Sequence, residues 1–142
     1  MRPPRILVVE DHPDIAVLIQ VLLQRVGCEV ISAGNGQDAL ALYAERRPDA
    51  VVLDLNLPRL PGWEVCKAIK SQSTTPIVVV TGQTPTEGAA QRLAIGADVY
   101  LLKPFKVLTL LAELERLLKL RVARSARPAP SQAARSVPAA PA

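Results

Sequence analysis

Five short apolar runs, separated by segments of helical periodicity, restrict this chain to one class of fold. Several of the runs are apolar almost throughout, which is typical of strands that are covered on both faces of a parallel sheet. The sequence therefore predicts an α/β fold. The expected strands cover residues 5–10, 28–33, 50–54, 76–81 and 98–103.

The segments between these runs have the spacing of amphipathic helices. The first lies between Pro13 and Gly27, and the second follows Gly36 until Pro48 stops it. Shorter ones are expected after Gly62 and Pro85, and the last covers residues 107–118. Strict alternation of strand and helix implies right-handed crossovers and helices on both faces of one sheet. We therefore predict a doubly wound, flavodoxin-like (βα)5 fold, with a five-stranded parallel sheet in the order 2-1-3-4-5.

Composition separates a folded part from a basic C-terminal segment. The chain has 142 residues, which is enough for one domain of ordinary size. Residues 121–142 contain four of the 17 basic residues and none of the 13 acidic ones, and they are rich in Ala, Pro and Ser. We predict a folded domain over residues 1–120 and a disordered tail over residues 121–142.

No stretch of the sequence is expected to insert into a membrane. Uninterrupted apolar stretches such as residues 15–19 and 77–80 are far shorter than the roughly 18 residues that a spanning helix needs. The N-terminal residues also lack the apolar core of a secretory signal, because charge follows after four apolar residues. These observations predict a cytoplasmic protein.

Polar side chains end four of the five expected strands. The first strand ends in Glu10 and Asp11, the third in Asp54, the fourth in Thr81 and the fifth in Lys103. In an open α/β sheet, ligands bind outside the carboxyl ends of the strands, where the strand order reverses. Because strands one, three, four and five are neighbours in the proposed order, we expect these side chains to share one edge.

Three carboxylates at one site need a cationic partner. Two like unit charges 4 Å apart repel by about 4 kcal/mol at an effective dielectric of 20. Lys103 supplies one positive charge, and Mg²⁺ suits the remainder because it prefers oxygen ligands. A carboxylate, a lysine, a hydroxyl and Mg²⁺ are the parts that phosphoryl transfer needs. Asp54 is the candidate nucleophile, since Glu10 and Asp11 form a pair suited to holding the metal.

At these positions the chain resembles the receiver domains of bacterial two-component response regulators, including single-domain regulators of the chemotaxis type. The resemblance covers residues 5 to about 120. It depends on the motifs "VVED", "VVLDLNLPRLPG", "VVVTG" and "YLLKPF", in that order. Each motif alone is a weak signal, but the ordered set is specific.

The resemblance implies a metal site and a phosphoacceptor. Glu10 and Asp11 are expected to hold Mg²⁺ together with Asp54 and the backbone carbonyl of Asn56, and Asp54 is expected to be phosphorylated. Two residues depart from the family pattern. Glu10 stands where Asp is commoner, which favours a water-mediated contact with the metal, and Pro61 replaces a small polar residue.

The same resemblance assigns roles to the last two strand ends. Thr81 and Lys103 are expected to contact the phosphoryl group, and the peptide bond between Lys103 and Pro104 is expected to be cis. Tyr100 occupies the position of a switch residue that moves inward when Thr81 shifts toward the phosphate. The face formed by helix four, strand five and helix five would change with it, and this face is also where a homodimer is expected.

The predicted function is that of a stand-alone receiver in a Mg²⁺-dependent phosphorelay. A sensor histidine kinase or a phosphotransfer protein would transfer its phosphoryl group to Asp54, and the phosphorylated chain would then switch a protein partner. Apart from its own phosphorylation and dephosphorylation, the chain is not expected to be an enzyme.

Two other functions remain open. In the first, the chain is a scaffold that binds a partner through its leucine-rich last helix and basic tail. Nucleic acid is not the expected partner, because the arginines have no interleaved aromatics or DNA-binding module beside them. In the second and less favoured function, it is an aspartyl-phosphate phosphatase of the haloacid dehalogenase type. That class has a second Asp as general acid two residues after its nucleophile, where this chain has Asn56.

Two further features have plainer interpretations. The segment "GNGQDA", Gly34 to Ala39, matches the G-x-G-x-x-A dinucleotide fingerprint, but it follows an edge strand and lies away from the switch point. We interpret it as the turn that begins a helix. His12, the single histidine, stands beside Pro13 and is interpreted as a solvated loop residue.

Overall fold

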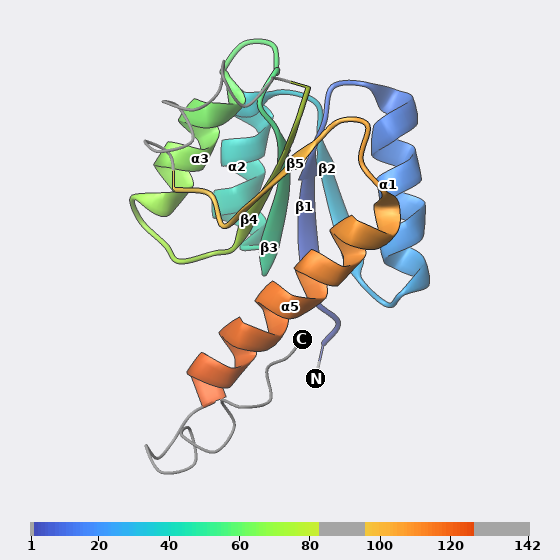
Figure 1. The fold of residues 1–142 in the computed structure, drawn as a ribbon. Helices are drawn as coiled ribbons and strands as arrows, with labels where there is room; N and C mark the ends of the chain where they lie inside the picture. The colour runs from blue at the N-terminus through green and yellow to red at the C-terminus, as the bar shows by residue number, and fades with distance from the viewer. Residues whose placement is uncertain (1, 83–95, 127–142) are drawn as a thin grey trace.

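The computed structural model has one parallel sheet between two layers of helices (Figure 1). It describes residues 2–82 and 96–126, with side chains up to residue 119. The strand order β2-β1-β3-β4-β5 and the parallel pairing of every neighbour confirm the predicted topology. The strands are β1 (Arg5–Val9), β2 (Glu29–Ala33), β3 (Ala50–Asp54), β4 (Ile77–Thr81) and β5 (Val99–Leu102).

The described helices fall in the segments that showed helical spacing. None of them is long and apolar enough to cross a membrane. The helix expected after Pro85 lies outside the described residues, and so does most of the expected tail. The last helix continues through residues 121–126, which the composition had assigned to that tail. The helices are α1 (Pro13–Arg25), α2 (Gly36–Arg46), α3 (Gly62–Lys70) and α5 (Val107–Ala126).

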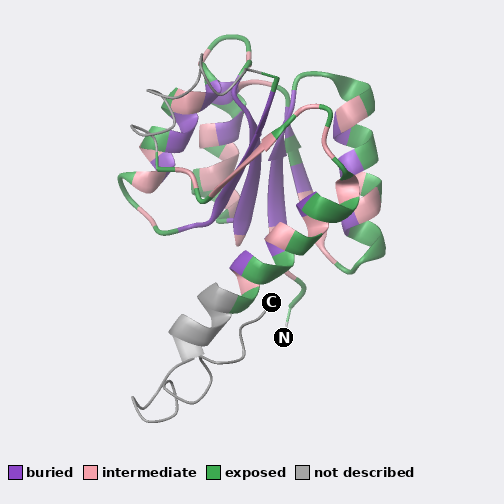
Figure 2. Ribbon diagram, in the orientation of Figure 1, coloured by how far each residue is buried: buried purple, intermediate pink, exposed green. Residues whose placement is uncertain are grey.

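Both faces of the sheet are covered, which explains why the strands lack polar alternation. Helices α2 and α3 lie on one face and helices α1 and α5 on the other (Figure 1). In β1, Leu7 and Val9 face the first pair of helices, while Ile6 and Val8 face the second pair. The central strands are therefore buried along their length, as the purple colour of the sheet shows (Figure 2). Successive apolar residues serve two separate cores.

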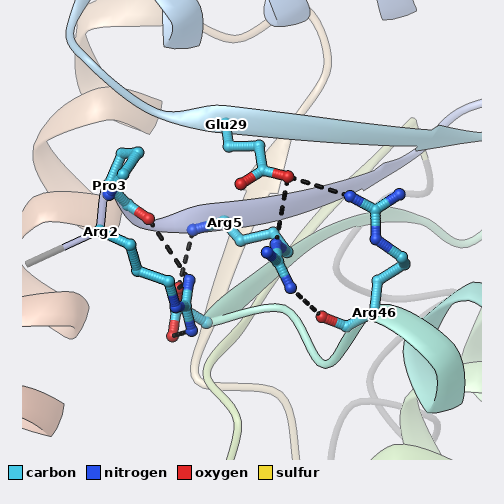
Figure 3. Close-up of polar contacts among 6 residues, drawn as sticks. Arg2, Pro3, Arg5, Glu29 and Arg46 are labelled. Carbon is cyan, nitrogen blue, oxygen red and sulfur yellow. Dashed lines mark hydrogen bonds and ion pairs between the residues drawn. The ribbon is translucent and has the colours of Figure 1, made fainter.

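Ion pairs and hydrogen bonds connect several elements at the amino ends of the strands, opposite their carboxyl ends (Figure 3). The backbone amide of Arg5 donates to the Asp49 carboxylate at 2.7 Å, and Arg2 pairs with the same carboxylate at 3.0 Å. Glu29 accepts from Arg46 at 3.0 Å and lies 3.3 Å from Nε of Arg5. The guanidinium of Arg5 also donates to the carbonyl of Arg46 at 2.6 Å. These contacts connect β1, β2 and the end of α2.

The "GNGQDA" segment begins α2 and packs against the loop that follows β3. The side-chain oxygen of Asn35 accepts a hydrogen bond from the backbone amide of Asp38 at 2.8 Å, which caps the helix. A Cβ on Gly36 would collide with the backbone carbonyl of Leu60 and lie 2.7 Å from its Cβ. The glycine therefore serves a close approach between two backbones, and the helix-starting interpretation agrees with the structure.

We expect Arg47→Gly to stabilise the protein by about 1 kcal/mol, because Arg47 ends α2 with φ of 47°, a conformation that glycine adopts without a Cβ clash. Urea unfolding of both proteins measures the change. The matched control is Arg46→Gly, one residue earlier, which puts glycine inside the helix and removes the pair with Glu29. This control should lose stability, and equal losses in the two variants would contradict the prediction.

Candidate functional site

Three strand ends bring an ammonium group between two carboxylates. Asp54 ends β3, and Glu10 directly follows β1. Lys103 directly follows β5, and its Nζ lies 3.1 Å from Oε1 of Glu10 and 3.1 Å from Oδ2 of Asp54. Because β4 lies between β3 and β5, these two strands are about 10 Å apart, and the side chains of Lys103 and Asp54 meet across the end of β4. The predicted convergence of these three residues is therefore present.

The two carboxylates that contact Lys103 are buried, and this burial makes their charges costly. Asp54 is 2% exposed and Glu10 is 3% exposed, whereas Asp11 is exposed. Besides Lys103, Asp54 accepts a hydrogen bond on Oδ1 from the backbone amide of Asn56 at 3.0 Å. The turn after β3 thus supplies a donor to the same side chain that the strand places at the edge.

The pKa values of the two carboxyls shift in opposite directions. Burial raises the pKa of Asp54, and the nearby charge of Glu10 adds to this effect, against the hydrogen bonds from Asn56 and Lys103. Burial also acts to raise the pKa of Glu10, but hydrogen bonds from His12 and Lys103 outweigh it, so that this pKa is lowered. Burial acts to lower the pKa of Lys103, but its two carboxylate partners raise it. Asp54 is therefore the less well stabilised anion of the pair.

Thr81 and Pro104 complete the edge next to these residues. Thr81 is buried at the end of β4, and its backbone carbonyl accepts a hydrogen bond from the amide of Lys103 at 2.8 Å. The peptide bond between Lys103 and Pro104 is cis. Tyr100 lies within β5, paired with Val79 of β4. Its side chain is half-buried and packs against the core between the sheet and helices α2 and α3. The ends of β4 and β5 are thus joined directly beside the Lys103 side chain.

A glycine holds the loop of Asp54 against α3. A Cβ on Gly62 would collide with the backbone carbonyl of Asp54 and lie 2.6 Å from Cα of Leu55. The amide of Gly62 donates to the carbonyl of Leu55 at 3.0 Å. Pro61, one of the departures from the family pattern, precedes α3 without a side-chain cap. The start of α3 therefore approaches the backbone of Asp54 at a distance that only glycine allows.

His12 belongs to the site, although the sequence suggested a solvated loop residue. Its ring is exposed, but Nδ1 lies 3.1 Å from Oε2 of Glu10 and 3.3 Å from Oδ1 of Asp11. The hydrogen bond with Glu10 raises the pKa of His12, and the charge of Asp11 adds to this effect. The sequence does contain a signal for this role, because His12 directly follows Glu10 and Asp11 at the end of one strand.

The donor set fits a divalent cation. Glu10, Asp11, His12 and Asp54 each offer one ligand atom, and these four atoms lie within 4.8 Å of one another. Three carboxylates face the single ammonium of Lys103 here, so that negative charge remains in excess. Hard oxygen donors in such a cluster match the preference of Mg²⁺. The predicted metal residues Glu10, Asp11 and Asp54 are therefore brought together.

Comparison with known proteins places this arrangement in a family. The model of the response regulator receiver domain matches residues 6–115. The chain belongs to the response regulator receiver family. Curated relatives include the DNA-binding response regulator MtrA of Mycolicibacterium smegmatis, which is 40% identical over 115 residues. Another is the probable transcriptional regulator ycf27 of Porphyridium aerugineum, at 34% over 119 residues. The matches cover 81% and 84% of this chain but 50% of each relative, so the receiver spans about half their length.

Solved receiver structures share the fold over nearly their whole length. The receiver domain of Francisella response regulator 1452 has a TM-score of 0.78 and 30% identity, covering 83% of this chain and 98% of that one. The chemotaxis response regulator CheY4 of Vibrio cholerae has a TM-score of 0.75 and 36% identity, covering 81% and 98%. The receiver fold is thus established for the described core.

We expect Lys103→Met to destabilise the receiver by about 2 to 3 kcal/mol, because it leaves two buried carboxylates without their cation. The side chain of Lys103 is 22% exposed, which places the loss at the lower end of the range for buried pairs. Urea unfolding measures the loss. Lys106→Met, at an exposed lysine three residues later, is the control and should change stability little. Equal effects of the two substitutions would refute the assigned role of the Lys103 ammonium.

Asp54→Asn should stabilise the metal-free receiver at pH 7. In the folded protein the pKa of Asp54 is raised above its ordinary 3.8, so that ionisation of Asp54 favours the unfolded chain. The gain should shrink as the pH falls through the raised pKa and vanish below 3.8, where Asp54 is protonated in both states. Unfolding in EDTA between pH 7 and pH 4 follows this trend. Asp14→Asn, at an exposed acid in α1, should show no gain, and a loss in Asp54→Asn at pH 7 would contradict the argument.

Proposed function

We propose that Asp54 is the phosphoacceptor of a Mg²⁺-dependent phosphorelay. The supporting observation is the buried Asp54 carboxylate, 3.1 Å from the Lys103 ammonium and grouped with Glu10 and Asp11. In the proposed step an Asp54 oxygen attacks the phosphorus of a phosphohistidine on a sensor kinase or phosphotransfer protein. The new O–P bond forms as the N–P bond breaks, and the histidine nitrogen leaves with the electron pair.

Glu10, Asp11, Asp54 and the backbone carbonyl of Asn56 would hold the ion in this proposal. When bound, Mg²⁺ would neutralise negative charge on the phosphoryl oxygens. Lys103 now pairs with two carboxylates and would exchange one of them for a phosphoryl oxygen, since an ammonium has three donors. The positive charge needed for the transferred group is thus already placed beside the nucleophile.

The output of the switch is proposed to pass through Thr81 and Tyr100. Thr81 lies at the end of β4, between the strands of Asp54 and Lys103, so that its hydroxyl is suited to bind the phosphoryl group. Tyr100 would then move inward and change the face made by β5 and α5 together with helix four, whose expected residues lie outside the described ones. A signal requires that a partner, or a second copy of the receiver, bind one form of this face better than the other.

Two features favour this proposal over the alternatives. The apolar face of α5 packs on the sheet through Leu110, Leu114 and Leu117, so most of it is already covered, which disfavours a scaffold that binds through this helix. The backbone amide of Asn56 donates to Asp54, and its carboxamide side chain is too weakly acidic to act as a general acid, which disfavours a phosphatase. We propose self-directed phosphoryl transfer and dephosphorylation alone.

The curated relatives are described as DNA-binding or transcriptional regulators. Because the receiver spans about half of their length, we propose for this chain only the phosphorylation of a receiver domain and not the binding of DNA. The proposed partner is a protein and not a nucleic acid. The stand-alone role, the cytoplasmic location and a disordered tail after residue 126 stay predictions.

Incubation with Mg²⁺ and phosphoramidate tests the proposed acceptor. One phosphate that is stable in acid and labile in base should be added to Asp54, as located by peptide mass. Asp54→Asn should take up none, and Asp14→Asn should be modified like the parent chain. No modification, or equal modification of the Asp54 variant, would refute the proposal. Steady release of phosphate from unrelated monoesters would support the phosphatase, and partner binding unaffected by Asp54→Asn would support the scaffold.

A further inference from the structure

His12 directs its ring into the acidic cluster although it begins a helix. It occupies the N-cap position of α1, yet its side chain makes no capping hydrogen bond. The backbone carbonyl of His12 accepts from the amide of Ala16 at 3.0 Å, so the helix starts on backbone contacts. The ring nitrogen Nδ1 instead lies next to Glu10 and Asp11. The side chain is therefore available to the metal site and is not needed by the helix.

The distances around Nδ1 match those between neighbouring ligands of one ion. With ligands about 2.1 Å from an octahedral ion, adjacent ligand atoms are about 3.0 Å apart and opposite ones about 4.2 Å apart. Nδ1 of His12 lies 3.1 Å from Oε2 of Glu10 and 3.3 Å from Oδ1 of Asp11. The whole set, including Asp54, fits within 4.8 Å. Little rearrangement separates this hydrogen-bonded cluster from a shared coordination shell.

We propose that His12 is an additional ligand that directs this site toward late first-row divalent ions such as Ni²⁺ and Zn²⁺. Imidazole is a good ligand for these ions and a poor one for Mg²⁺, whose ligands are oxygens. A given site generally binds Ni²⁺ more tightly than the earlier first-row divalent metals, so the proposal concerns the additional preference for Ni²⁺ that the imidazole provides. The inference rests on the proposed function in that both use Glu10, Asp11 and Asp54 as metal ligands.

The first test observes the ring itself. The chain contains one histidine, so tag-free protein labelled with ¹⁵N-histidine gives the ring signals of His12 alone. Addition of Zn²⁺ at pH 8 should shift the resonance of one ring nitrogen to that of a coordinated imidazole, whereas saturating Mg²⁺ should produce no such coordination shift. If Zn²⁺ binds by calorimetry and neither ring nitrogen shifts, the proposal is wrong.

The second test measures metal preference. Calorimetric titrations with Ni²⁺ and with Mg²⁺ give the ratio of the two affinities for each protein. His12→Gln should reduce this ratio about tenfold or more, because one imidazole ligand is lost from the Ni²⁺ site. Asp14→Asn, which changes an exposed carboxylate two residues later and outside the cluster, should keep the parent ratio. An unchanged ratio in His12→Gln would overturn the inference.

These experiments separate failure of the inference from failure of the proposed function. If the parent chain binds Mg²⁺ and is phosphorylated on Asp54, but His12 gives no coordination shift, the phosphorelay function stands and the role of His12 is refuted. If the chain binds Zn²⁺ through His12 but is never phosphorylated with Mg²⁺, the metal inference stands and the phosphorelay is refuted.

Discussion

The contact of Lys103 with Glu10 and Asp54 is the interaction on which the site depends. Its three members come from β5, β1 and β3, so they meet only if the sheet has the order in which β4 alone separates β3 from β5. Two buried carboxylates without the ammonium would repel each other and lack solvation. The fold therefore brings the charges together, and the lysine makes their burial tolerable.

The opposite pKa shifts within this cluster give its two buried acids different roles. Glu10 receives donors from His12 as well as Lys103, which lower its pKa and favour its anionic form, the form that suits a cation ligand. For Asp54, the effect of burial exceeds that of the hydrogen bonds from Asn56 and Lys103, and its pKa is raised. An anion that its surroundings stabilise poorly gains when its charge is offset, by a metal ion or by transfer of a phosphoryl group. The carboxylate proposed as the phosphoacceptor is thus the less well stabilised of the two buried ones.

The strands, their order and the meeting of Glu10, Asp54 and Lys103 follow from sequence, because a parallel sheet has few topologies and collects its strand ends at one edge. The direction of the His12 ring does not, since it depends on a rotamer choice between helix cap and acidic cluster. The collisions that exclude a side chain at Gly36 and Gly62 do not follow from sequence either. The first involves a residue distant in sequence, and the second depends on how the loop after β3 folds. The extension of α5 past residue 120 was missed because Ala and Arg are good helix formers, even where the apolar period ends.

The site divides its chemistry between two short segments. Residues 10–12 follow β1 and supply Glu10, Asp11 and His12, whereas the loop after β3 supplies the Asp54 carboxylate and the amide of Asn56. In the proposed function, changes in the first segment would alter which ion is held, and changes in the second would alter the nucleophile and its immediate donors. The two segments are coupled through Lys103, which contacts one carboxylate from each. If Glu10 held a cation as proposed, its contact with Lys103 would weaken, and the ammonium would be freer to bind phosphoryl oxygens on Asp54. In the proposed function, the ion held by the first segment would in this way set how readily Asp54 is phosphorylated.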